Sequence, residues 1–238
     1  MELVRASESS FFSFGFFFCF CAHSLTLSHV QSPTMTDYKS LAQQWHTIAS
    51  PHDMTVRVLE YEMVDQPVGG RGVEAVNTAV KVHHFEVSSE VLTKTEFFQR
   101  MLADEHKENI IDLEVDHWKA VGVWLKILHD DGLKNAHSKD VSLFTIWHML
   151  VVADRYGLDT KAKEAKSWFA AWFFGKDWTD YDQCRMLLLP CYTFDHAFGF
   201  ARATRTLAYK AASHITELRP RGFVNDQFSL PKAVIRKL

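Results

Sequence analysis

The order of the periodic segments constrains this fold most, because strand-like patterns come first and helix-like patterns follow to the end. Met54–Val64 is rich in β-branched residues and alternates polar with apolar side chains from Arg57 to Glu62, which predicts a strand. Ala75–Val87 predicts a second strand, and the glycine-rich loop QPVGGRG between them predicts an antiparallel pair. Runs of strands followed by runs of helices favour an α+β fold over a doubly wound sheet.

Helix signals with recognisable starts and stops follow the second strand. Ser88 or Ser89 can cap a short helix, and Thr95 can cap another. The stretch NIIDL then predicts a short buried strand. A further helix is expected to begin at Asp116 and to stop at Asp131–Gly132.

The two best-defined helices lie in the middle of the chain. Ser142–Gly157 is apolar almost all round, which is typical of a buried helix, and Gly157 is a natural terminal residue. The segment 160–175 is amphipathic, and its predicted core residues are Ala165, Trp168, Phe169, Trp172 and Phe173. Three more helices are expected at about Asp180–Leu189, at Phe194–Ile215 and from Lys232 to the end.

The segment Thr36–Ile48 also shows helical spacing. Tyr38, Leu41, Trp45 and Ile48 fall on one stripe of such a helix, and Ser50-Pro51 would end it. An apolar stripe of this kind needs a surface against which to pack.

Residues 1–34 are expected to lie outside the fold. Their apolar run, Phe11–Ala22, is about a dozen residues long, whereas a membrane-spanning helix needs about 20. Met35 opens a stretch that looks like an ordinary protein start. We therefore interpret residues 1–34 as a disordered leader or a mispredicted upstream start, with a secretory signal peptide as the alternative.

Composition favours an intracellular protein, in the cytoplasm or the nucleus. The 238 residues carry a net charge of −3, so nothing suggests a nucleic-acid partner, which requires a clustered basic face. No membrane partner is expected either. The four cysteines form no CxxC pair, so a zinc-ribbon or thioredoxin site is unsupported. Cys184 and Cys191 are expected to be small buried apolar residues.

Few residues suggest catalysis or metal binding. His83 and His84 are adjacent in a predicted strand, so they point to opposite faces and cannot share one metal ion. The cluster His129–Asp131 is interpreted as the end of a helix. The chain has no nucleophile elbow and no phosphate-binding loop. We therefore expect no cofactor, no metal and no enzymatic activity.

Three other residues leave one enzymatic alternative open. His148 lies inside the buried helix and is expected to donate to a carbonyl group or to a solvent pocket. His196 opens a helix and is expected to be structural. An enzyme whose site forms only in three dimensions, around His148, His196 and Cys191, is the alternative.

Four segments follow one another along the chain: FEVSSEVL, FFQRML, IIDLEVDHWKAVGVWLKILH and LVVADRYGL. Their order and spacing resemble a BTB/POZ domain, particularly the form found in many fungal proteins. The resemblance implies a small sheet flanked by helices over residues 36–175. The stretch CYTFDHAFGFARATRTLAYKAASHITE resembles the C-terminal region of the same group, which implies a helical extension over residues 176–238. Many relatives carry His in place of Ser88, and Ala-Ser-Pro in place of Lys94-Thr95-Glu96.

The resemblance implies a protein–protein interaction module, either a dimerisation scaffold or an adaptor. In the family, the element before the first strand often packs on a partner subunit, so Tyr38, Leu41, Trp45 and Ile48 are candidates for a dimer helix. Packing of this helix on its own domain is the alternative. The resemblance also implies a second role, as a substrate adaptor of a cullin-type ubiquitin ligase. Glu108 matches the family's contact residue, but His106 stands where a hydrophobic residue is usual.

Overall fold

The computed structural model describes residues 37–68, 72–103, 109–113, 117–129, 141–210, 215–223 and 227–235. These residues all belong to one compact unit, Pro33–Leu238. The leader expected over residues 1–34 lies outside the described ranges. Within those ranges, no helix is both long enough and apolar enough to cross a membrane.

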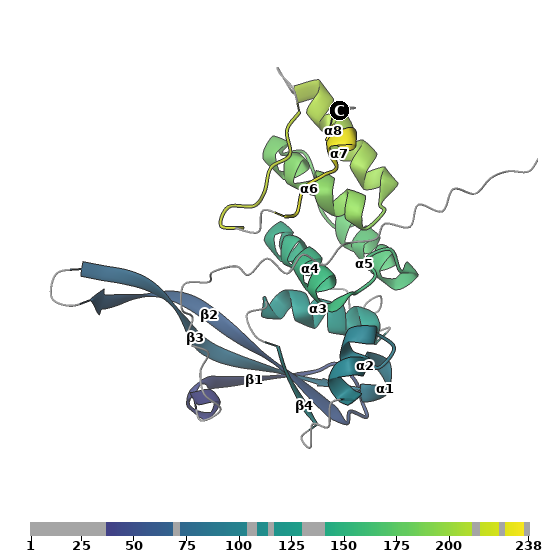
Figure 1. Ribbon diagram of the computed structural model, residues 1–238. Coiled ribbons are helices and arrows are strands. Elements are labelled where there is room, and N and C mark those ends of the chain that lie inside the picture. The colour runs from purple at the N-terminus through teal and green to yellow at the C-terminus, as the bar shows by residue number, and fades with distance from the viewer. Residues whose placement is uncertain are drawn as a thin grey trace, which may run out of the picture. The chain divides into compact units, whose positions relative to one another are not determined.

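A four-stranded sheet with the strand order β1-β3-β2-β4 forms one side of the unit (Figure 1). β2 (Met54–Val68) and β3 (Gly72–Val87) form an antiparallel hairpin, as predicted. β1 (Ala42–Thr47) pairs with β3, and β4 (Ile110–Leu113) pairs with β2, both in parallel. The short strand predicted from NIIDL is therefore confirmed.

The hairpin is longer than the sequence predicted. Gln66, Pro67 and Val68 were expected in the loop, but they continue β2, and Gly72 already belongs to β3. β1 pairs only with Lys81–Glu86 of β3, and β4 pairs only with Thr55–Val58 of β2. The distal part of the hairpin therefore continues as two strands (Figure 1).

The predicted N-terminal helix is wrong. Residues Asp37–Ser40 form a single 3₁₀ turn, η1, and the following residues form strand β1. The helical spacing was coincidental, because Trp45 and His46 point to opposite faces of the sheet and pack against residues of β3. Pairing with a strand almost 40 residues away overrides the local pattern here, as tertiary context often does.

The helices after the hairpin follow the predicted order. α1 (Ser89–Leu92) and α2 (Glu96–Ala103) come first. α3 (Trp118–Leu128) begins after His117, whose ring accepts a hydrogen bond from Ala120 N at 3.4 Å. The expected cap Asp116 and the expected stop Asp131–Gly132 lie outside the described residues, and the observed caps are His117 and His129.

The two central helices are confirmed, the first with its boundaries and the second from three residues after its predicted start at 160. α4 (Leu143–Tyr156) begins at the cap Ser142, whose hydroxyl oxygen accepts a hydrogen bond from Thr145 N. It ends at Gly157, whose φ of 62° lies in the left-handed region that glycine adopts without strain. α5 (Lys163–Phe174) buries all five of the residues that were expected in the core.

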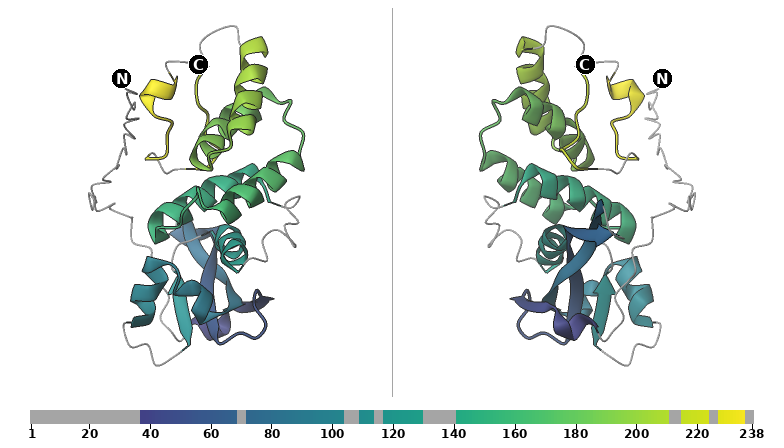
Figure 2. Two further views of the ribbon diagram at one scale, coloured as in Figure 1. Left: turned by 90° about the vertical axis from the view of Figure 1, so that its right-hand side faces the viewer. Right: turned by 90° about the vertical axis from the view of Figure 1, so that its left-hand side faces the viewer.

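The C-terminal helices differ from their predicted limits. α6 (Tyr181–Thr193) continues through Pro190 and does not stop at Leu189. α7 (Ala197–Lys210) begins three residues later than expected, because Phe194 and Asp195 form the turn between the two helices. α8 (Lys232–Ile235) is a single turn, and 215–223 has no regular secondary structure. α6 and α7 lie side by side (Figure 2).

One hydrophobic core runs through both predicted regions. It extends from Ile48 to Leu230 and contains residues of the sheet and of the helices α3 to α7. α3 packs on β2 and β3, where Gly122 lies so close to the Phe85 ring that a Cβ there would come within 2.8 Å of it. Cys184 and Cys191 are buried and free, as predicted.

Four buried indoles connect separate parts of this core. Each indole N–H donates to a main-chain carbonyl, at distances between 2.8 and 3.0 Å. The four pairs are Trp124 with Met149, Trp147 with Met186, Trp172 with Val141, and Trp178 with Phe173. These bonds satisfy the only polar atom of each indole, so the large rings can be buried at little cost.

Candidate interaction surface

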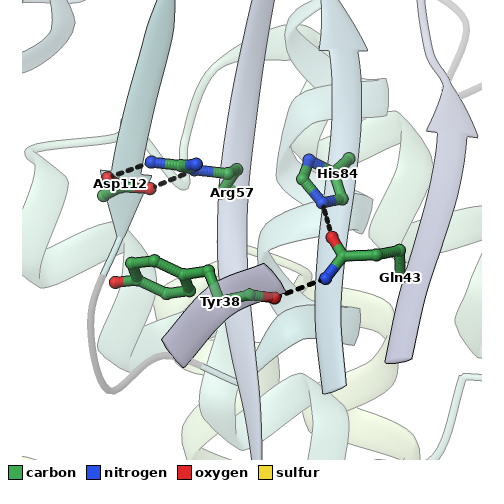
Figure 3. A network of polar contacts seen from close by, with 5 residues as sticks. All are labelled: Tyr38, Gln43, Arg57, His84 and Asp112. Atoms are coloured by element: carbon green, nitrogen blue, oxygen red, sulfur yellow. Dashed lines mark hydrogen bonds and ion pairs between the residues drawn. The ribbon is translucent and has the colours of Figure 1, made fainter. Parts of the chain in front are cut away.

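The two faces of the sheet have different chemistry. The face toward α3 is largely apolar and buried around Val56, Val58, Phe85 and Ile111. The opposite face carries one residue from each strand at the same level: Trp45 on β1, His84 on β3, Arg57 on β2 and Asp112 on β4. We call these four residues the polar row; Figure 3 shows three of them together with Gln43 and Tyr38.

One half of the polar row is an ion pair. Arg57 donates from Nε to Asp112 Oδ1 and from Nη2 to Asp112 Oδ2, both at 2.6 Å (Figure 3). This two-pronged geometry is the strongest form of the interaction between arginine and a carboxylate. The guanidinium carbon also lies 5.0 Å from the centre of the Tyr38 ring. Arg57 therefore holds both β4 and the η1 turn against β2.

The other half of the polar row attaches β1. His84 Nε2 donates to Gln43 Oε1 at 2.5 Å, and the Gln43 amide donates to the carbonyl oxygen of Tyr38 at 2.6 Å (Figure 3). The Trp45 ring stacks on His84, with the ring centres 4.2 Å apart and the planes 14° apart. Side chains thus supplement the main-chain pairing of β1 with β3.

A second set of polar contacts attaches β1 on the core face. His83 Nε2 donates to Glu60 Oε2 at 3.0 Å, so the neutral ring accepts at Nδ1. His46 Nε2 lies 3.0 Å from this atom and donates to it. The Trp118 ring stacks on His83, with the centres 3.8 Å apart. The chain His46–His83–Glu60 therefore links three strands under the start of α3.

The electrostatics of this chain favour neutral imidazoles. Burial lowers the pKa of His46, and its neighbours His83 and Lys126 lower it further. Burial also lowers the pKa of His83, although Glu60 acts in the opposite direction. Burial raises the pKa of Glu60, but hydrogen bonds from His83 and Trp118 outweigh it and hold that pKa below its usual value. The chain is thus a carboxylate bound by neutral rings.

The four residues of the candidate dimer helix do not share a face. Tyr38 packs on Arg57, whereas Ile48 is buried in the core. Leu41 is half-buried, and Trp45 is 59% exposed at the edge of the sheet. Only Trp45 is thus presented to a partner. His106 and Glu108, the candidate cullin contacts, lie outside the described residues.

His129 has the structural role that was expected of it. Its Nδ1 donates to the carbonyl oxygen of Leu125 at 2.7 Å, and its Nε2 accepts from Ser88 N at 3.0 Å. The ring therefore joins the end of α3 to the start of α1. His83 and His84 point to opposite faces of the sheet, as predicted, because one stacks on Trp118 and the other on Trp45.

The donor role expected of His148 is not seen at its Nε2 atom. Its Nε2 is buried without a hydrogen-bond partner. Its ring instead stacks on His117, with the centres 4.6 Å apart, and contacts Phe144 and Phe223 edge-on. Burial lowers the pKa of His117 and that of His148 to about 4. Both rings are therefore neutral at neutral pH.

His196 and Cys191 also have structural surroundings. His196 Nδ1 accepts from Gly199 N at 3.2 Å, and its ring lies against Phe169 and Phe173. Burial raises the pKa of the Cys191 thiol, so this cysteine is not an activated nucleophile. His148 contacts a different set of aromatic rings. Across the described ranges, no three His, Cys, Asp or Glu side chains group as metal ligands.

The polar row and the chain His46–His83–Glu60 were not predicted. The alternation around Arg57 indicated a strand with one polar face, but the partners on β1 and β4 depend on the register of the sheet. The chain matches no protein-family model and no curated protein. The polar row and the free edge of the sheet are therefore the features from which a function has to be inferred.

Proposed function

We propose that this protein is a non-enzymatic protein–protein interaction module, a dimerisation or adaptor scaffold of the BTB/POZ type. The order of its elements is the observation that supports this most. FEVSSEVL covers the end of β3 and α1, FFQRML lies in α2, and IIDL is β4. HWKAVGVWLKILH covers α3 with its two caps, and LVVADRYGL covers the end of α4. The described parts of these four segments thus coincide with single elements or with junctions between them.

The connections between these elements support the same proposal. After the hairpin, the chain passes through α1 and α2 before β4 pairs in parallel with β2, the first strand of the hairpin. α3 then packs on β2 and β3. A small sheet flanked by helices is the arrangement that the resemblance implies.

The surroundings of the histidines support a role without catalysis. His129 joins two main-chain segments, and His196 accepts from the first turn of α7. His83 is fully buried between Trp118 and Glu60. A general acid or base must reach a substrate. These rings face protein groups instead.

The exposed Trp45 at the edge of the sheet supports a role in binding. Tryptophan and arginine are the residues most enriched among those that dominate binding energy at interfaces. The polar row presents Trp45 at the sheet edge and holds Arg57, two strands away, in a fixed orientation. An ordered side-chain array loses little conformational freedom when a partner binds.

The solution mass of the full-length chain tests the proposal. We expect light scattering behind size exclusion to give twice the monomer mass at micromolar concentrations. A monomer at every concentration would contradict self-association. The adaptor role would then have to be tested by titration with purified partners, beginning with a cullin scaffold.

A further inference from the structure

We infer that two copies of this protein associate through the free edge of β1, which pairs with its own copy in antiparallel orientation about a two-fold axis. This inference rests on the proposed function, because it names the surface by which the scaffold self-associates. The surface consists of the six residues of β1, Ala42–Thr47.

β1 is the outermost strand of the sheet and has one unpaired edge. β3 lies on one side of it, and no other strand among the described residues pairs with the opposite side. Ile48 N donates to the carbonyl oxygen of Glu86 at 2.9 Å, which shows that residue 48 points its main-chain groups toward β3. Main-chain groups alternate in direction along a strand. Gln43, Trp45 and Thr47 therefore direct their N–H and C=O groups outward.

The edge lacks the features that protect edge strands from pairing. Such strands commonly carry lysine or other charges, a proline or a bulge. The sequence AQQWHT contains none of the charged residues Asp, Glu, Lys or Arg and no proline, and its pairing with β3 is regular. Its histidine, His46, is turned to the core face and bonded to His83.

The absence of charge favours a second copy over other occupants. When a strand pairs with itself, any charged side chain meets a like charge on the facing strand, and such pairs are destabilising. β1 would meet only neutral side chains. A strand adapted to a charged partner would be expected to carry the complementary charge, and β1 carries none.

The geometry also selects a register. In an antiparallel pair with two-fold symmetry, one residue faces its own copy, and facing side chains lie on the same side of the sheet. With Trp45 at the axis, Trp45 faces Trp45, and Gln43 faces Thr47 of the second copy. These are the three residues whose main-chain groups point outward, so every outward group finds a partner. Moving the axis to Gln44 or His46 leaves some of them unpaired.

Trp45 supplies the apolar contact that strand pairing alone lacks. The ring is 59% exposed although it stacks on His84, so one of its sides is open. A facing Trp45 would cover that side, and cross-strand aromatic pairs are among the more stabilising in sheets. The two four-stranded sheets would then continue into one another through the pair of β1 strands.

Charge and main-chain variants of the full-length chain test the inference by light scattering. Trp45→Lys places like charges opposite each other at the axis. Thr47→Pro removes an outward N–H and leaves the N–H groups that bond β3 intact. We expect both variants to keep the wild-type circular dichroism and to dimerise at least about tenfold more weakly, which corresponds to about 1.4 kcal/mol. Phe174→Lys, a control at another exposed aromatic ring, should dimerise like the wild type.

Cysteine crosslinking tests the register and does not depend on how well the charge variants fold. We expect Trp45→Cys to form a disulfide-linked dimer on mild oxidation, because residue 45 faces its own copy. Gln44→Cys should form no disulfide-linked dimer under the same conditions. The wild-type chain is the control for crosslinking through its four native cysteines.

The outcomes separate this inference from the proposed function. A wild-type dimer that persists in both edge variants and gives no crosslink at residue 45 would overturn the β1 interface, but self-association would stand. A wild-type monomer at all concentrations would overturn both the β1 interface and self-association. A crosslink at residue 44 in place of 45 would overturn the register.

Discussion

β1 and α5 are attached to the rest of the protein by opposite means. α5 buries the aromatic rings of Trp168, Phe169, Trp172 and Phe173 almost completely. β1 contributes no large buried side chain, and polar side-chain contacts such as Gln43 with His84 and His46 with His83 supplement its main-chain pairing.

The two kinds of attachment make β1 easier than α5 to separate from the rest of the protein. Burial of apolar surface is non-directional and does not depend on protonation. Hydrogen bonds between imidazoles require a particular tautomer on each ring, and each bond contributes only about 1 kcal/mol net. We therefore expect α5 to belong to the cooperative unit, whereas β1 can detach from a protein that remains folded.

The largest expected effect is the loss of stability when a buried aromatic ring of α5 is removed. Trp172→Ala should lower the free energy of unfolding by about 3–5 kcal/mol, because it leaves a cavity and removes the bond to Val141. Urea unfolding followed by circular dichroism measures this. The matched control Phe174→Ala, at the exposed end of the same helix, should change it by no more than about 0.5 kcal/mol. Equal losses in the two variants would contradict the assignment of α5 to the core.

Acid is the next largest perturbation, and it acts on the buried rings. The pKa of His117 is about 4 in the folded protein against 6.5 ordinarily, so the unfolded chain binds more protons between these values. The contribution of His117 to the free energy of unfolding is therefore complete above pH 6.5 and is lost as the pH falls toward 4. At pH 5 this group alone costs about 2 kcal/mol, and the stacked His148, whose pKa is lowered to the same value, adds to the loss.

Urea midpoints measured at pH 7 and pH 5 check the acid effect. His117→Asn is the matched control, because asparagine caps a helix but does not titrate. Its urea midpoint should fall less between pH 7 and pH 5 than that of the wild type. An unchanged midpoint at pH 5 would show that these rings are more solvated than the structure describes.

The smallest expected effect concerns β1 itself. His46→Phe removes the bond to His83 but retains an aromatic ring beside Phe85 and Trp118. Amide hydrogen exchange in the strand should become several-fold faster, while the urea midpoint of the whole protein stays within about 0.5 kcal/mol of the wild type. A loss of global stability as large as that of Trp172→Ala would show that β1 belongs to the cooperative core after all.

The helical half of the fold could be predicted because its signals are local. The cap Ser142, the terminal Gly157 and the aromatic spacing of α5 lie within the elements that they define. The helix predicted for 36–48 failed for the opposite reason. The conformation of Trp45 depends on His84, which the sequence places almost 40 residues away.

The candidate surface was still less predictable. Arg57 and Asp112 are 55 residues apart and meet only because β4 pairs with β2 in one particular register. Shifting that register by one residue would turn Asp112 to the other face. The sequence does contain a sign of the polar face, the polar residues that alternate with Val56 and Val58, but it does not contain the identity of their partners.

The positions of the indoles also make tryptophan fluorescence a probe of the folding and assembly of this protein. Trp124, Trp147, Trp172 and Trp178 each sit at a different junction, and Trp45 alone among the described tryptophans stands mainly in water. Indole emission moves to longer wavelengths when water replaces a buried surrounding. The native spectrum is therefore a sum of blue and red components, and the red one belongs to the strand edge where a second copy would dock.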